Sequence, residues 1–265
     1  ALLAARRNHT KINMDDLEEA LDRVIGGPQR KSRVLDKHEQ KVIAYHEAGH
    51  AVVGELLEKS DPVHKVTILP RGMSLGSTWQ MPEQDKYLVT QQELLDDVTA
   101  LLGGRVAEEL VFQEITTGAS NDLQRVTSIV RSMVCDYGMS DKLGTLALGR
   151  RSHNPFLGRD YVQDERNYSE DVAKLIDEEV RRIVDLCHER AKSILIENRD
   201  KLDELVRALL EHETLNRDEF LAVMRGESLP ARPPVASDEQ TPNATSDAEK
   251  QGQPVPRLEP GTGTI

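Results

Sequence analysis

The segment HEAGH, residues 46–50, decides the fold, and it lies inside the longer stretch DKHEQKVIAYHEAGHAVVGELLEK, residues 36–59. Apolar residues recur through this stretch with the period of an α-helix. Acidic residues precede the apolar stripe, and Ser60-Asp61-Pro62 follows it with the chemistry of a turn. The pattern therefore predicts one long helix over this stretch.

Two glycines, Gly49 and Gly54, lie within the predicted helix. Each weakens a helix by about 1 kcal/mol relative to alanine, so each needs a compensating reason. One such reason is that the missing side chain lets a neighbouring backbone or a substrate approach closely. We therefore expect close packing against this helix at the glycines.

Two histidines four residues apart lie on one face of a helix, about 6 Å apart along its axis. His46 and His50 can therefore bind one metal ion, and Glu47 would lie beside that ion, where it can deprotonate a bound water. Zinc favours nitrogen ligands and lowers the pKa of bound water towards ~7. The motif predicts a zinc-dependent endopeptidase site with Glu47 as the general base.

A catalytic zinc site needs a third protein ligand. The metzincin pattern would require glycine at position 53 and histidine at position 56, but the chain has Val53 and Leu56 there. A gluzincin-like site would take Glu108 or Glu109 from a later helix. Asp122 is the other candidate, because an aspartate at a helix N-terminus is stabilised as an anion. The residues alone leave all three carboxylates open.

Several further motifs follow in a fixed order, namely VTILPRG, LGST, LLGGRVAEEL, TTGASNDL and MVCDYGMSDKLG. Together with HEAGHAVV they resemble the peptidase domain of FtsH-type membrane-anchored AAA proteases. The resemblance covers roughly residues 1–227. It implies that His46, His50 and Asp122 bind zinc and that Glu47 is the general base.

The resemblance also implies that Glu108 orients a ligating histidine without binding the metal itself. Two departures from the family pattern are visible. Gln113 stands where a glycine is usual, and Ser77-Thr78-Trp79 replaces a more usual Tyr-Thr pair. Neither departure touches the expected ligands, but the second could alter how substrate fits.

In this family the peptidase domains form homo-hexameric rings below an ATPase ring, which unfolds membrane and soluble polypeptides. The resemblance thus implies polypeptide substrates. It implies that ATP binding and membrane contact occur only through segments outside this sequence. The sequence contains no G-x-x-x-x-G-K-[ST] loop, the usual ATP-binding motif. It places the intact protein in the inner membrane with this domain on the cytoplasmic side. The alternative is a helical oligomerisation module with a structural or silent metal site. The intact Glu47 argues against that alternative, because a structural zinc site needs no base.

Composition limits the partners and the compartment. The 265 residues carry a net charge of −12, which argues against nucleic acid as a partner. Cys135 and Cys187 have no metal-binding spacing and suit a reducing compartment. No apolar run approaches the ~20 residues needed to cross a bilayer, and there is no signal peptide. Since the sequence also begins without methionine, we expect a soluble fragment of a larger protein.

The predicted fold class is mainly α-helical, a zinc-metalloprotease domain with a small β element near the metal helix. The predicted parts are residues 1–34 as the end of an AAA lid and its linker, 35–227 as the peptidase domain, and 228–265 as a disordered tail rich in Pro, Ser, Thr, Gln and Gly.

Within the peptidase domain, the alternating segment at Val66–Leu69 is predicted to be a strand whose exposed edge binds extended substrate. Helices are expected at 91–113, 120–137 and 168–198, with a shorter pair at 199–224, and residues 150–161 are expected to form a polar loop. The histidines that are expected to be isolated and solvated are His9, His38, His153, His188 and His212.

Overall fold

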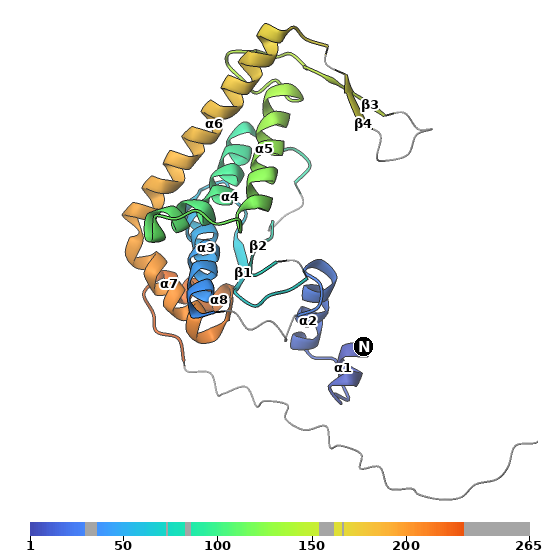
Figure 1. Ribbon diagram of the computed structural model, residues 1–265. Helices are drawn as coiled ribbons and strands as arrows, with labels where there is room; N and C mark the ends of the chain where they lie inside the picture. The colour runs from blue at the N-terminus through green and yellow to red at the C-terminus, as the bar shows by residue number, and fades with distance from the viewer. Residues whose placement is uncertain (30–35, 73, 83–85, 154–161, 166, 231–265) are drawn as a thin grey trace, which may run out of the picture. The chain divides into compact units, whose positions relative to one another are not determined.

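The helix that carries the HEAGH motif lies at the centre of the structure and is covered by later helices (Figure 1). The computed structural model describes residues 1–29, 36–72, 74–82, 86–153, 162–165 and 167–230. The predicted tail therefore lies outside the described residues from position 231 onward. The mainly helical fold class with a small β element is confirmed.

The helices are α1 Leu2–Arg6, α2 Met14–Ile25, α3 Lys37–Leu56, α4 Gln91–Phe112, α5 Ser120–Cys135, α6 Glu170–Glu197, α7 Arg199–His212 and α8 Arg217–Met224. The predicted helices from position 36 onward agree with these to within a few residues. Of the described helices, none is both long and apolar enough to span a membrane.

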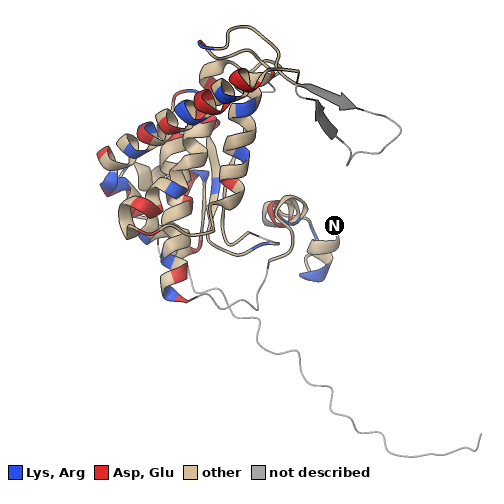
Figure 2. Ribbon diagram, turned by 45° about the horizontal axis from the view of Figure 1, so that its top comes forward, with Lys and Arg blue, Asp and Glu red and all other residues tan. Residues whose placement is uncertain are grey.

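Helix α3 begins where the sequence predicts, because Asp36 caps it. The backbone N–H of Asp36 donates to the Glu39 carboxylate at 3.3 Å. The helix then packs on α4 and α7, which bury its apolar face. Helix α6 packs on α4 and α5 and carries residues of both charge signs along its length (Figure 2). The motif helix is therefore held as an internal element, with amphipathic helices around it.

Helices α3 and α4 cross with their backbones almost in contact at two glycines. A Cβ atom on Gly49 would lie 2.4 Å from the Gly103 carbonyl oxygen, and one on Gly103 would lie 2.6 Å from the Gly49 carbonyl oxygen. Neither backbone can accommodate such an atom without shifting a helix. The expected close approach at Gly49 is confirmed, and its partner is the backbone of α4.

The β element is a three-stranded antiparallel sheet in the order β2-β1-β5, formed by β1 Val63–Thr67, β2 Ser77–Gln80 and β5 Thr214–Asn216. The predicted strand exists, but its predicted exposed edge is wrong. Strand β1 is paired on both sides, since Val66 lies opposite both Thr78 and Leu215. The edge strand that follows the motif helix is β2.

The predicted loop over residues 150–161 is also wrong at its start. Strand β3, Arg150–His153, pairs antiparallel with β4, Val162–Glu165. These strands are polar and lack apolar alternation, so the usual sequence signal for a strand is missing. The remainder of the predicted loop, residues 154–161, lies outside the described residues.

The helix crossing yields a stability prediction. Gly103→Ala should lower the free energy of unfolding, measured in urea, by about 1–3 kcal/mol. The reason is that the Gly49 carbonyl oxygen must move to make room for the new methyl group. The matched control is Gly54→Ala, whose new Cβ would meet the movable end of the Gln80 side chain at 2.3 Å. That control should be neutral or slightly stabilising, since alanine favours a helix. Equal effects of the two substitutions would contradict the packing argument.

Candidate metal centre

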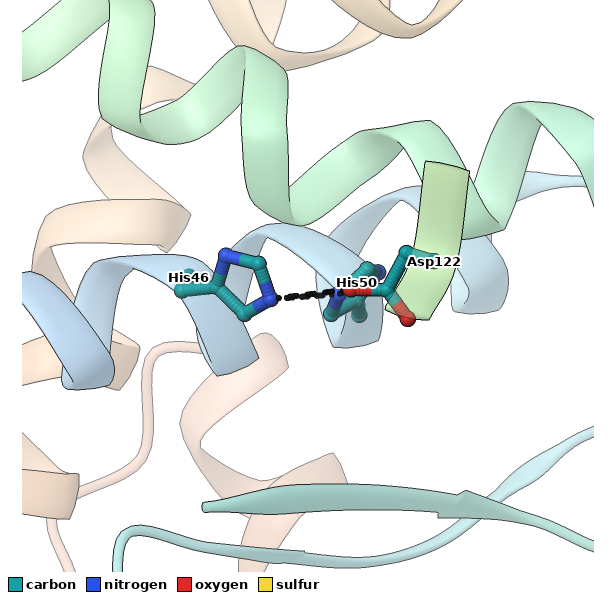
Figure 3. A group of neighbouring side chains, drawn as sticks. All are labelled: His46, His50 and Asp122. Carbon is teal, nitrogen blue, oxygen red and sulfur yellow. Dashed lines mark hydrogen bonds and ion pairs between the residues drawn. The ribbon is translucent and has the colours of Figure 1, made fainter. Parts of the chain in front are cut away.

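Three side chains from α3 and α5 converge on one point (Figure 3). His46, His50 and Asp122 offer one ligand atom each, and these atoms lie within 4.8 Å of one another. The Asp122 Oδ2 atom is 3.3 Å from His46 Nε2 and 3.5 Å from His50 Nε2, and the two Nε2 atoms are 3.0 Å apart. In the described part of the chain this is the one such group of three. Two imidazoles and one carboxylate are the donor set of a catalytic zinc site.

The position of each ligand-type atom follows from its element. His46 and His50 lie one turn apart on α3, so their rings project from the same face. Asp122 lies in the first turn of α5, where the helix dipole favours the ionised carboxylate. His50 and Asp122 are 72 residues apart in the sequence. They come together because α4 packs against both α3 and α5.

The second nitrogen of each histidine ring, Nδ1, also has a hydrogen-bond partner. His46 Nδ1 is 2.7 Å from Glu108 Oε1, and His50 Nδ1 donates to the Ala100 carbonyl oxygen at 2.9 Å. Glu108 is itself fixed, because its Oε2 accepts from the Thr116 backbone N–H at 3.2 Å and from the Thr116 hydroxyl at 2.9 Å. Both rings are consequently oriented with Nε2 towards Asp122.

The two glutamates of the AEEL run face opposite ways. The Glu108 side chain is 1 % exposed, whereas the Glu109 side chain is 41 % exposed and its Oε2 lies 3.2 Å from His188 Nε2. The expectation that His188 is isolated is therefore wrong, as is that for His9, whose ring contacts Asp16 at 3.0 Å. Neither contact is part of the metal centre.

The electrostatics of the cluster favour a bound cation. Burial alone would raise the pKa of Asp122, but hydrogen bonds with His46 and His50 outweigh it and hold that pKa well below its usual range. Burial alone would lower the pKa of His46, but Asp122 and Glu108 outweigh it and raise the pKa to about 10. Two carboxylates therefore stabilise positive charge at this point.

Glu47 lies beside the cluster and is not one of its three members. Its side chain is buried, and burial raises its pKa. The Thr78 hydroxyl donates to Glu47 Oε2 at 2.7 Å. Glu47 therefore has Thr78 as its hydrogen-bond partner and lies next to the point where the two histidines and Asp122 meet.

Three residues with a structural role at the site were not predicted from the sequence. A Cβ atom on Gly104 would lie 2.5 Å from His50 Nε2, so α4 contacts the histidine rings through its backbone. The signal for Gly104 is its pairing with Gly103 inside a helix, where two glycines are costly. Gly76 and Thr78 belong to the LGST motif, and both contact Glu47. No local pattern indicates those contacts, because Glu47 is distant in sequence.

A buried helix with two histidines and an intervening acid, joined by an aspartate from a second helix, defines the zinc metallopeptidase class.

The chain belongs to peptidase family M41, whose sequence model matches residues 33–223. It is similar to proteins named ATP-dependent zinc metalloprotease FtsH. It is 55% identical to the one from Pseudothermotoga lettingae over 228 residues, which are 86% of this chain and 36% of that protein. For the Thermotoga maritima protein the identity is 54% over 228 residues, 86% of this chain and 37% of that protein. For the Bacillus subtilis protein it is 51% over 233 residues, 88% of this chain and 36% of that protein.

The chain therefore spans little more than a third of the length of the curated relatives it matches. The resemblance to the FtsH-type peptidase domain is confirmed.

The opposite orientations of the two glutamates yield a prediction. Glu108→Ala should weaken zinc affinity by about 10–100-fold, because His46 loses the partner that orients its ring. The neighbouring substitution Glu109→Ala removes only a surface contact and should leave zinc affinity unchanged. Competition with a chelating dye measures both affinities. Loss of affinity in both variants, or in neither, would contradict the assignment of Glu108.

Proposed function

We propose that this domain hydrolyses internal peptide bonds of unfolded polypeptides, with His46, His50 and Asp122 as the zinc ligands and Glu47 as the general base. The observation that carries the proposal is the convergence of three ligand atoms within 4.8 Å beside a buried glutamate that is not among them. A structural zinc site is normally closed by four protein ligands, whereas three ligands leave a position open for chemistry.

The residues divide the chemistry between them. Bound zinc supplies Lewis acidity at the scissile carbonyl and lowers the pKa of water. Glu47 accepts the proton of the attacking water and delivers it to the leaving amide nitrogen. Burial raises the pKa of Glu47, which suits both steps. A group that first accepts a proton and later donates it works best when its pKa lies near the operating pH. Glu108 and the Ala100 carbonyl oxygen keep the histidine rings in their binding orientation.

Strand β2 is the element suited to hold the substrate. It pairs with β1 on one side and, among the described residues, is one of the two edge strands of the sheet. Its Thr78 contacts Glu47, so a peptide added along the outer edge of β2 would lie near the proposed base. Backbone hydrogen bonds to an edge strand recognise extended chains with little regard to sequence, as degradation of unfolded polypeptides requires.

The names of the relatives support an ATP-dependent role for the intact protein. Their names include ATP dependence, and this chain matches little more than a third of their length. We propose that the domain is the proteolytic part of a membrane-anchored, ATP-dependent homo-hexamer that degrades membrane and soluble proteins on the cytoplasmic side of the inner membrane. ATP binding and membrane anchoring would belong to segments outside this sequence.

The central prediction concerns Glu47. The zinc-loaded chain should hydrolyse unfolded casein, a chelator should stop the reaction, and added zinc should restore it. Glu47→Gln should abolish hydrolysis while zinc content stays near one equivalent per chain, because the amide keeps the shape but cannot accept the proton. Elemental analysis and casein release are the measurements.

Two outcomes would contradict the proposal. Substantial activity of Glu47→Gln would remove that residue as the base. A zinc-loaded wild-type chain that binds casein but leaves it intact would instead favour the oligomerisation module with a silent metal site.

A further inference from the structure

The carboxylate of Glu47 is held by residues 74–78, which include the first two residues of β2. The Thr78 hydroxyl lies 2.7 Å from Glu47 Oε2 and 3.0 Å from the Glu47 backbone oxygen. The carboxylate is the closer acceptor, and a hydrogen bond to a charged oxygen is the stronger type. Among the described residues, no second side-chain donor to this carboxylate is found.

Gly76 closes the other side of the same carboxylate. A Cβ atom at this position would lie 2.7 Å from Glu47 Oε1 and 2.9 Å from Glu47 Cγ. The backbone at Gly76 therefore packs directly on the side chain of Glu47. That backbone is fixed in turn, because the Ser74 hydroxyl donates to the Gly76 carbonyl oxygen. One carboxylate oxygen faces a hydroxyl and the other faces a backbone.

A glutamate has three rotatable side-chain bonds, and a base is effective only in the rotamers that reach the attacking water. The contacts of Thr78 and Gly76 limit the rotamers open to Glu47. Thr78 lies opposite Val66 in the β1–β2 pair, so the position of its hydroxyl is set by the sheet. The sheet edge and the carboxylate are thereby coupled through one hydrogen bond.

We propose, resting on the function proposed above, that Thr78 is a positioning residue that fixes the Glu47 carboxylate for proton transfer. The hydroxyl does not contact the reacting atoms. It acts through Glu47, and it keeps that carboxylate in register with the edge of β2 where the substrate would lie. Thr78 should therefore affect turnover rather than zinc binding or substrate affinity.

The test compares Thr78→Val, which keeps the branched shape but loses the hydroxyl, with Thr78→Ser, which keeps the hydroxyl. A fluorogenic peptide gives kcat and KM for the zinc-loaded full chain. Thr78→Val should lower kcat by about 10–100-fold with KM within about threefold, the size expected for a misplaced catalytic group. Thr78→Ser should restore kcat to within about threefold of wild type. The matched control is Thr127→Val, which removes a hydroxyl that donates to the Leu123 carbonyl oxygen within α5, and it should leave kcat unchanged.

Two further readouts separate positioning from folding. Zinc content should stay at one equivalent in every variant. The single tryptophan of the chain, Trp79, adjoins Thr78, so its unchanged emission spectrum would report that β2 is in place. Wild-type kcat in Thr78→Val, an equal loss in Thr78→Ser, or loss of zinc would each overturn the role of Thr78. An inactive zinc-loaded wild type would overturn the proposed function itself.

Discussion

The close crossing of α3 and α4 is the constraint on which the rest of the site depends. The Gly49 carbonyl oxygen faces the Cα atom of Gly103, and the Gly103 carbonyl oxygen faces the Cα atom of Gly49. The two helix axes therefore approach closer than ordinary side chains would permit. This approach brings Glu108 and the Ala100 carbonyl within hydrogen-bond distance of the histidine rings. A wider crossing would leave both rings free to rotate and would move α4 away from Asp122.

Three carboxylates close to one another have different partners, which gives each a different chemistry. Asp122 faces both Nε2 atoms from the first turn of a helix, and its lowered pKa keeps it ionised. Glu108 faces the opposite side of the His46 ring and is held by Thr116. Glu47 faces Thr78, and burial raises its pKa. The proposed division into ligand, orienting group and base follows from these partners.

The sequence predicts the local part of this arrangement. The period of apolar residues locates α3, and the spacing of His46 and His50 places both rings on one face without reference to the rest of the chain. The third carboxylate is not determined in this way, because Glu108, Glu109 and Asp122 become distinguishable only when α4 and α5 pack on α3. The wrong expectation of a free edge on β1 has the same cause. Leu215 in β5 pairs with Val66 across a long sequence separation that no local pattern reports.

The most direct test of the account is a crystal structure of the zinc-loaded chain with anomalous diffraction at the zinc edge. We expect one zinc ion bound by the Nε2 atoms of His46 and His50 and by a carboxylate oxygen of Asp122, each at about 2.0–2.2 Å. Glu108 would remain on His46 Nδ1, and Glu47 would lie beside the ion without binding it. A glutamate oxygen at bonding distance, with Asp122 turned away, would contradict the account and indicate a gluzincin-like centre.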